Sequence, residues 1–384
     1  MTWASAVARV PALSKQFLDV IVPDMHLNHL NPQQREAALH TEGPLLLLAG
    51  AGSGKTGVIT HRVAHLVTSL GVDPHNVLAV TFTNKAAREM RERVAKLVGP
   101  VKGEGLTLAT FHSLCARILR AEIEALGYKR NFSIYGVTDQ HHLVRDLMAN
   151  INAEHGINVD QVLWRISDAK NRLIAAENFR PSRPDDPVAV MTSRVYPEYQ
   201  KCLKSYNALD FDDLLTLTLR LFAEHPQVLE RYQQRFRYIM VDEYQDTNHA
   251  QFELVRQLAA HWRNLCVVGD DDQSIYGWRG ADPGNILDFE RHFSGARVIR
   301  LEQNYRSSGH ILAAANGVIG HNRLRKEKAL WTAGEKGEVV SLVACSDAED
   351  EARAVVERIQ SNILQRDMKY RDHAILLRTN AQTM

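Results

Sequence analysis

The chain has 384 residues, of which 45% are apolar and 24% charged, and its 46 basic and 45 acidic residues leave a formal net charge of +1. This is the composition of a globular protein of two or three domains, and the balanced charge excludes a uniformly basic surface. No apolar run reaches the roughly 18 residues that span a bilayer, and the scattered cysteines favour a reducing cytoplasm without disulfides or a zinc ribbon. They are Cys115, Cys202, Cys266 and Cys345. We therefore expect a cytoplasmic protein with no membrane partner.

The first 24 residues show no recognisable pattern, and we treat them as an N-terminal extension of unknown role. Two explanations remain open. Met25 can be the true start of the protein, or the extension can form a small extra helix.

A strand–loop–helix pattern follows. The apolar run Leu45–Leu48 predicts a strand, and a helical stretch begins after Thr56. Backbone N–H groups of a glycine-rich loop in this context close around phosphate oxygens, so we expect Lys55 to reach the β- and γ-phosphates and Thr56 to bind Mg²⁺. A glycine-rich turn without a ligand is the alternative. The loop consists of Ala49, Gly50, Ala51, Gly52, Ser53, Gly54, Lys55 and Thr56.

The next two apolar strands end in aromatic, hydroxyl and basic residues. Val77–Val80 leads into Thr81–Met90, and between Lys85 and Lys102 there are six basic and two acidic residues. Residues 107–112 form a second such strand end. Basic residues interleaved with aromatic ones are typical of a track for single-stranded nucleic acid. A solvated basic helix face is the alternative.

Residues 113–205 contain no phosphate motif and are predicted to be mostly helical, for example over Leu114–Leu126 and Gln140–Ile151. The acidic stretch that follows, with Asp210, Asp212 and Asp213, permits a metal site. We prefer the simpler interpretation that these acids begin a helix.

A further strand, Tyr238–Val241, delivers two adjacent carboxylates. An open α/β sheet binds its ligands at this end of its strands. We interpret Asp242 as a ligand of Mg²⁺ and Glu243 as the carboxylate that polarises the attacking water.

The strand Leu265–Val268 leads into Gly269–Gly280, which holds acids, an amide and two aromatic residues that packing alone does not explain. We interpret Gln273 as a sensor of phosphate, and Tyr276 or Trp278 as a residue that stacks on a base. A core position for Trp278 is the alternative.

Taken in order, these motifs resemble those of UvrD/Rep-type superfamily 1 DNA helicases, and the resemblance is closest to Rep. One such motif would be weak evidence, whereas seven in the family's order are specific. The guanine signature of GTPases is absent, because Asn84-Lys85 is followed by two alanines. The resemblance covers about residues 28–384 and rests on Leu30–Gln34, Ala49–Thr56, Thr81–Met90, Thr110–Arg120, Val241–Asn248, Val268–Ala281 and Leu301–Ser307.

The resemblance implies further roles. Gln34 would read the adenine edge, and Gln273 would couple the γ-phosphate to DNA. Tyr305 would stack on adenine, and Arg306 would reach the γ-phosphate from the second motor domain. The catalytic set implied by the resemblance is Glu243, Lys55, Gln273 and Arg306. The positions that it implies for DNA contact are Phe82, Thr83, Thr110, His112, Tyr276, Trp278 and Arg279.

Two departures from the family pattern matter. Gly57 stands where the family usually has an arginine that packs on adenine opposite the tyrosine, so we expect weaker base affinity. Residues 372–382 match the start of the family's second motor domain, and its later motifs, including a second arginine directed at the γ-phosphate, do not follow within the chain. An arginine finger can be worth roughly 10³–10⁵ in rate. We therefore expect that this chain does not unwind DNA alone.

The expected fold is α/β, with a RecA-like parallel sheet formed by residues 25–112 and 206–303. Residues 113–205 would be a helical insertion and residues 304–384 an incomplete second α/β lobe. In that lobe we expect the strands Val339–Val343 and His373–Leu377 and the helix Glu349–Ile363.

The leading hypothesis is an ATP-dependent 3′→5′ DNA helicase or translocase that uses ATP and Mg²⁺. It would act on single-stranded DNA and single/double-strand junctions in replication or repair. Protein partners in these processes are possible, and the sequence does not identify them. The polarity comes only from the resemblance. The alternative is a non-motile, ATP-regulated fragment that binds single-stranded DNA. A nuclease–helicase motor and a small-molecule kinase are less favoured, because the sequence shows neither a nuclease carboxylate cluster nor an acceptor site.

Overall fold

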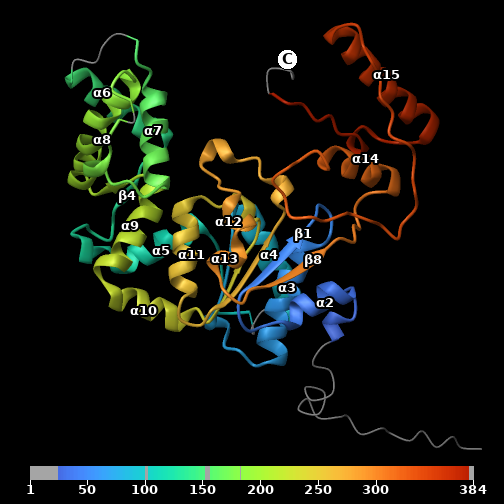
Figure 1. Ribbon diagram of the computed structural model, residues 1–384, viewed down its shortest axis with the longest axis horizontal. Coiled ribbons are helices and arrows are strands. Elements are labelled where there is room, and N and C mark those ends of the chain that lie inside the picture. Colours follow the sequence, from blue (N-terminus) through green and yellow to red (C-terminus); the bar gives the residue numbers. More distant parts are fainter. Residues whose placement is uncertain (1–24, 100–102, 152–155, 182, 380–384) are drawn as a thin grey trace, which may run out of the picture. The chain divides into compact units, whose positions relative to one another are not determined.

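The computed structural model describes residues 25–99, 103–151, 156–181 and 183–379. The chain divides into two compact units, and the division lies between Glu335 and Lys336 (Figure 1). The N-terminal extension of residues 1–24 lies outside the described residues.

The first unit is built around a parallel sheet. In the described residues it has six strands in the order β3-β2-β6-β7-β1-β8, and every neighbouring pair is parallel. β1 is central to the site because it lies between β7 and β8, with Leu45 opposite Cys266 and Arg297. This confirms the α/β fold class. The strands are β1 Leu45–Ala49, β2 Val77–Thr81, β3 Thr107–Thr110, β6 Tyr238–Val241, β7 Asn264–Gly269 and β8 Arg297–Leu301.

Strands β1 and β2 are buried on both faces, which explains why they are nearly continuous apolar runs. The edge strand β8 has exposed residues and includes two arginines. Successive side chains of a strand point to opposite faces. Accordingly Leu45 and Leu47 belong to one hydrophobic core, while Leu46 and Leu48 belong to the other. Apolar residues of α2 (Pro32–Leu39), α3 (Lys55–Ala64) and α4 (Asn84–Val98) complete the first core. The second core is completed by α5 Phe111–Glu122, α9 Phe211–Glu224, α10 Pro226–Arg235, α11 His249–Ala259, α12 Gly284–Leu287 and α13 Phe289–His292.

Three further helices have a core of their own and lie together in Figure 1. The expected helix over 140–151 is part of the first of them, whereas the expected helix over 114–126 corresponds to α5 and the short helix Ile123–Leu126, which pack with the sheet. The two-residue strands β4 (Ser133–Ile134) and β5 (Ala208–Leu209) pair where the chain enters and leaves this helical part. The three helices are α6 Val137–Asn150, α7 Val159–Asn171 and α8 Pro187–Ser205.

The acids at the start of α9 cap this helix, as the simpler interpretation predicts. Asp210 is the N-cap, and its Oδ1 accepts the backbone N–H of Asp213 at 2.8 Å. In return, Oδ2 of Asp213 accepts the backbone N–H of Asp210 at 3.2 Å. The amino group of Lys170, from α7, lies 2.6 Å from Asp210 and 2.7 Å from Asp213. This buried ammonium group takes the place that a metal ion would need.

The chain beyond β8 differs from the expected second lobe in two ways. The helix α14 (Gly309–Ile319) and the residues up to Glu335 belong to the first unit, so the compact units do not divide at residue 304. In the second unit the expected helix is present as α15 (Ala348–Arg366), but the expected strands 339–343 and 373–377 are not formed. These two strand predictions were wrong. A strand requires a hydrogen-bonded neighbour, and neither segment pairs with another among the described residues.

Candidate nucleotide site and nucleic-acid surface

The phosphate loop begins where β1 ends at Ala49. Gly52 and Gly54 have φ angles of +70° and +83°, a left-handed conformation that favours glycine. Ser53 is buried, and its hydroxyl donates to the carbonyl oxygen of Gly50 at 2.7 Å, which closes the turn. No side chain caps the N-terminus of α3, which begins at Lys55. Its first N–H groups lack intrahelical acceptors and point at the loop, as an anion site requires.

The structure brings the predicted loop and the predicted carboxylates together. The amino group of Lys55 lies 3.1 Å from Oε2 of Glu243. The hydroxyl of Thr56 donates to Oδ2 of Asp242 at 3.3 Å. Two neighbouring oxygens in an octahedral Mg²⁺ shell are about 3 Å apart, since each Mg–O bond is about 2.1 Å. Thr56 and Asp242 therefore fit the role of Mg²⁺ ligands.

Burial changes the acidity of this strand end. It raises the pKa of Asp242 to about 6, and the charge of Glu243 adds to this effect. The same two causes raise the pKa of Asp246 to about 6. Ammonium and metal cations favour the ionised form of such carboxylates. Three carboxylates, those of Asp242, Glu243 and Asp246, therefore lie at this strand end with the ammonium group of Lys55. A divalent cation bound there would offset their negative charge.

Gln245 is a residue of this site that sequence reasoning missed. Its Nε2 donates to Oε2 of Glu243 at 2.9 Å, and its Oε1 accepts the N–H of Asp270 at 3.0 Å. The Nε2 of Gln273 in turn donates to Oδ2 of Asp270 at 2.5 Å. A hydrogen-bonded chain thus leads from Lys55 to Gln273. The signal was an amide two residues after Glu243, the predicted catalytic carboxylate.

The segment after β8 lies on the phosphate loop. The Nδ2 of Asn304 donates to the carbonyl oxygen of Ala51 at 2.6 Å. The backbone N–H of Tyr305 donates to the carbonyl oxygen of Gly52 at 3.0 Å. A Cβ on Gly52 would lie 2.6 Å from the Asn304 amide and 2.8 Å from Cβ of Arg306. Tyr305 and Arg306 therefore flank the loop from the first unit, whereas the resemblance placed Arg306 in the second domain. Asn304 was missed by sequence reasoning.

The residues predicted to contact adenine form a small network. The Nδ2 of Asn31 donates to the Tyr305 hydroxyl at 2.9 Å and to Oε1 of Gln303 at 3.2 Å. Gln34 is buried, accepts the N–H of Asn31 and donates to the carbonyl oxygen of Ser53 at 2.9 Å. Gln34 thus holds the phosphate loop in place, and its reading of adenine stays a prediction. Its side chain would have to exchange these bonds to do so.

Gly57 lies in the first turn of α3, in open space. A Cβ added at this residue would meet no atom within 4 Å among the described residues. The position that carries an arginine in the family therefore has room here for the Cβ of a larger residue.

The predicted DNA contacts fall into two groups. One lines a pocket of about 380 Å³, where Phe82, Thr110 and His112 meet Phe211. The rings of His112 and Phe211 are 5.8 Å apart and edge to face. Burial lowers the pKa of His112, which favours the neutral form of this ring. Thr83, which follows β2 next to Phe82, caps α4, because its hydroxyl oxygen accepts the backbone N–H of Ala86. Sequence reasoning missed Phe211. The available signal was a phenylalanine among the aspartates that begin a predicted helix, where an apolar residue is unusual.

The second group lies on the exposed helix Gly277–Arg279 and next to it. Trp278 is 63% exposed, which excludes a core position, and Tyr276 is 41% exposed. The Arg279 guanidinium lies 4.4 Å from the Trp278 ring centre and 5.9 Å from that of Tyr276. Two rings and a cation at one solvent-facing turn are suited to stacking on bases beside a phosphate backbone.

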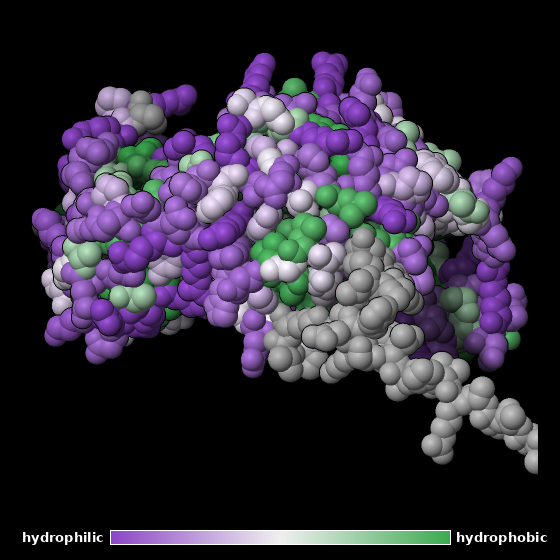
Figure 2. All heavy atoms as spheres, turned by 90° about the horizontal axis from the view of Figure 1, so that it is seen from below, coloured by the Kyte–Doolittle hydropathy of each residue, from purple (hydrophilic) through white to green (hydrophobic). Residues whose placement is uncertain are grey.

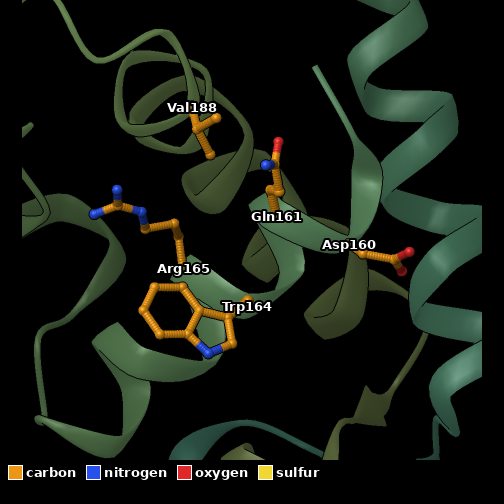
Figure 3. Close-up of a pocket in the computed structure, with 5 residues that line it drawn as sticks. All are labelled: Asp160, Gln161, Trp164, Arg165 and Val188. Atoms are coloured by element: carbon orange, nitrogen blue, oxygen red, sulfur yellow. The ribbon is translucent and has the colours of Figure 1, made fainter. Parts of the chain in front are cut away.

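A further pocket, of about 360 Å³, lies in the helical part and holds none of the predicted site residues (Figure 3). Trp164 and Arg165 of α7 line it together with Val188 of α8. Arg165 pairs with Asp186 at 2.8 Å, while Trp164 is 53% exposed.

The face shown in Figure 2 is mostly hydrophilic, with a few apolar patches. Among the described residues, every helix is too short or too polar to cross a bilayer.

Comparison with known proteins agrees with this geometry. A family model described as the UvrD/REP helicase N-terminal domain matches residues 30–294. The chain belongs to the UvrD/REP helicase family. A second model, the UvrD-like helicase C-terminal domain, matches residues 299–384. The resemblance inferred from the seven motifs is thereby confirmed.

Curated relatives include two proteins named ATP-dependent DNA helicase PcrA. The one from Staphylococcus aureus is 51% identical over 359 residues, which are 93% of this chain and 49% of the relative. The one from Staphylococcus epidermidis is 48% identical over the same shares of both chains. The chain thus spans about half the length of the curated relatives it matches.

Proposed function

We propose that this chain is the nucleotide-binding half of an ATP-dependent DNA helicase or translocase that moves 3′→5′ on single-stranded DNA. The observation that carries the proposal is the meeting of Lys55 with Glu243, and of Thr56 with Asp242, at the carboxyl end of a parallel sheet. Single/double-strand junctions in replication or repair are the proposed substrates, which implies a location in the cytoplasm. The polarity rests on the family resemblance, and DNA helicase activity is supported by the names of the relatives.

The domain roles belong to the same proposal. Residues 25–112 and 206–303 would form the ATP-binding motor domain, and residues 113–205 an insertion whose core is that of α6, α7 and α8. Residues 304–384 would form the start of the second motor domain. Within this range, residues 304–335 belong to the first compact unit.

The catalytic roles follow from charge and geometry. Lys55 and the N–H groups at the start of α3 would hold the phosphates of ATP. Glu243 would accept the proton of the attacking water, because Gln245 orients its carboxylate. Mg²⁺, held by Thr56 and Asp242, would neutralise charge on the phosphate oxygens. The exposed Arg306, beside Gly52, would supply a further positive charge.

The DNA would follow the two aromatic groups. The Phe82–His112–Phe211 pocket and the Tyr276–Trp278–Arg279 turn lie at ends of parallel strands of one sheet, or next to them. Gln273 would connect the second group to the nucleotide through Asp270. This arrangement is suited to coupling ATP hydrolysis with movement along a strand.

The test is steady-state ATP hydrolysis with and without single-stranded DNA, beside Lys55→Ala. We expect hydrolysis that DNA stimulates and that Lys55→Ala abolishes. Hydrolysis that Lys55→Ala leaves intact would contradict the assigned site.

A second candidate is the non-motile, ATP-regulated fragment that binds single-stranded DNA. It is favoured by the absence of any strand among the described residues of the second unit, because a two-lobed motor steps by closing both lobes around ATP. Strand displacement on a duplex with a 3′ single-stranded tail separates the candidates. DNA binding without displacement supports the fragment, whereas displacement supports the motor.

A further inference from the structure

Three consecutive aspartates after β7 bring their carboxylates together in a buried position. Oxygens of Asp270, Asp271 and Asp272 lie within 4.8 Å of one another, and these side chains are at most 8% exposed. Like charges so close together are unfavourable unless a cation neutralises them. The cation here is the amino group of Lys328, at 3.0 Å from Asp270, 2.5 Å from Asp271 and 2.6 Å from Asp272. It fills the position that a metal ion would need.

Lys328 belongs to residues 325–331, which we call the strap. Arg325, at its start, donates to both carboxylate oxygens of Asp272, at 3.1 and 2.8 Å. Near its other end the side chain of Leu330 covers Gly50 so closely that a Cβ on this glycine would collide with it. The strap therefore contacts both the aspartates after β7 and the phosphate loop.

Asp270 connects the strap to the catalytic carboxylate. Its Oδ1 pairs with Lys328, while its Oδ2 accepts the side-chain amide of Gln273. Its N–H donates to Gln245, which donates to Glu243 at 2.9 Å. Asp270 thus holds both Gln245 and Gln273 in place by hydrogen bonds.

We propose that Lys328 is a positioning residue of the ATP site, which acts through Asp270 to hold Gln273 and Gln245 in place. Its side chain contacts none of the groups assigned to phosphate or metal, so its effect on hydrolysis is indirect. The strap ends at residue 331 and the second unit begins at Lys336, so this contact also ties the ATP site to the segment that leads into the second unit. The proposal rests on the proposed ATPase function.

The charges support a permanent contact. Burial alone would lower the pKa of Lys328, but its hydrogen bonds to Asp271 and Asp272 outweigh burial and raise it. Burial would raise the pKa of Asp272, and its bonds to Lys328 and Arg325 outweigh this effect and lower it. The lysine is therefore charged at every pH at which such an enzyme is assayed.

The test compares Lys328→Met, which keeps the stem of the side chain and removes its charge, with Lys326→Met. Lys326 is the matched control because its amino group pairs with Glu290, away from the aspartates. Hydrogen–deuterium exchange of residues 269–280 and 325–331 measures whether the contact holds these segments. ATP hydrolysis and binding of a fluorescent ATP analogue measure the consequence for the site.

We expect Lys328→Met to speed exchange in both segments at least tenfold and to leave residues 107–120 unchanged. We expect kcat to fall at least tenfold, with a Kd for nucleotide within threefold of the parent value and partial rescue by Lys328→Arg. Unchanged exchange overturns the proposal, and so does faster exchange with unchanged kcat. An equal loss in kcat and nucleotide affinity also overturns it, because it indicates general damage to the site.

If Lys328→Met does not fold, the double variant Lys328→Met with Asp271→Asn replaces it. This variant keeps the net charge of the cluster but still lacks the contact with Asp270. Faster exchange and a lower kcat than in Asp271→Asn alone support the proposal, whereas values equal to those of Asp271→Asn refute it. A parent chain without DNA-stimulated hydrolysis contradicts the proposed function instead, and the exchange comparison alone then decides the role of Lys328.

Discussion

The amino group of Lys55 lies 3.1 Å from Oε2 of Glu243, although 188 residues separate the two in the chain. The lysine belongs to the first turn of α3 and the glutamate follows β6. Because β1 and β6 are parallel strands of one sheet, the segments that follow them emerge at the same edge. This contact ties the glycine-rich loop to the proposed catalytic carboxylate. Phosphates bound at the loop would compete with Glu243 for Lys55.

Glu243→Gln tests the role of this carboxylate. An amide cannot accept the proton of the attacking water, and general-base catalysis contributes roughly 10²–10⁴-fold. We expect kcat for ATP hydrolysis to fall at least about 100-fold, while nucleotide binding, measured with a fluorescent analogue, changes little. Glu230→Gln, at an exposed position of α10, is the control and should be neutral. Full activity of Glu243→Gln would falsify the assignment.

Gly57→Arg tests the open space beside the proposed adenine site. A Cβ at this position meets no neighbouring atom. An arginine that stacks on the base would contribute about 1 kcal/mol, or roughly fivefold in affinity. We expect a lower Kd for ATP in titration calorimetry. Gly57→Ala is the control, because it removes only the helix-destabilising glycine and should raise the free energy of unfolding by up to about 1 kcal/mol. Equal Kd values for the two variants would show that the arginine does not reach the base.

Trp278→Ala tests the second aromatic group. Stacking on one base contributes about 1–3 kcal/mol, so the Kd for single-stranded DNA should rise roughly 5- to 150-fold in fluorescence anisotropy. Nucleotide affinity should stay the same. Trp164→Ala is the matched control, since this tryptophan is similarly exposed but lies in the pocket of the helical part. A larger effect of Trp164→Ala than of Trp278→Ala would indicate that the DNA binds at the pocket of the helical part instead.

Asp213→Asn tests the buried network at the start of α9. Burial, together with the charge of Asp210, raises the pKa of Asp213 from 3.8 to about 6. The folded state then binds more protons than the unfolded state between these pH values, so this group costs stability as the pH rises through this window. Relative to Asp213→Asn, the parent chain should therefore lose unfolding free energy as the pH rises from 4 to 6.5.

Urea denaturation of both chains at several pH values measures this difference. Lys170→Met is the companion variant. Burial would lower the pKa of Lys170, but the charges of Asp210 and Asp213 outweigh it and raise the pKa, so the amino group is cationic and neutralises both carboxylates. Its removal should cost about 3–5 kcal/mol at pH 7 and less at pH 5. A difference between the parent and Asp213→Asn that does not vary with pH would contradict the network.

The sequence by itself determined the local elements of the site. The run Leu45–Leu48 and the loop that follows it form β1 and the turn to α3, because an apolar run favours a buried strand and glycines permit a left-handed turn. The strand before Asp242 was predictable because it too is an apolar run. The acids at the start of α9 were predictable because aspartates favour the N-terminus of a helix. In each case the information lies within about ten residues of chain.

Only the tertiary structure decided which of these elements meet. The pairing of Lys328 with three aspartates joins segments more than fifty residues apart, and no local pattern indicates it. The placing of Asn304 and Tyr305 on the phosphate loop depends on β8 adding to the sheet beside β1. Conversely, the apolar run 339–343 is typical of a strand but forms none, because a strand is stabilised by a neighbouring strand and not by its own sequence.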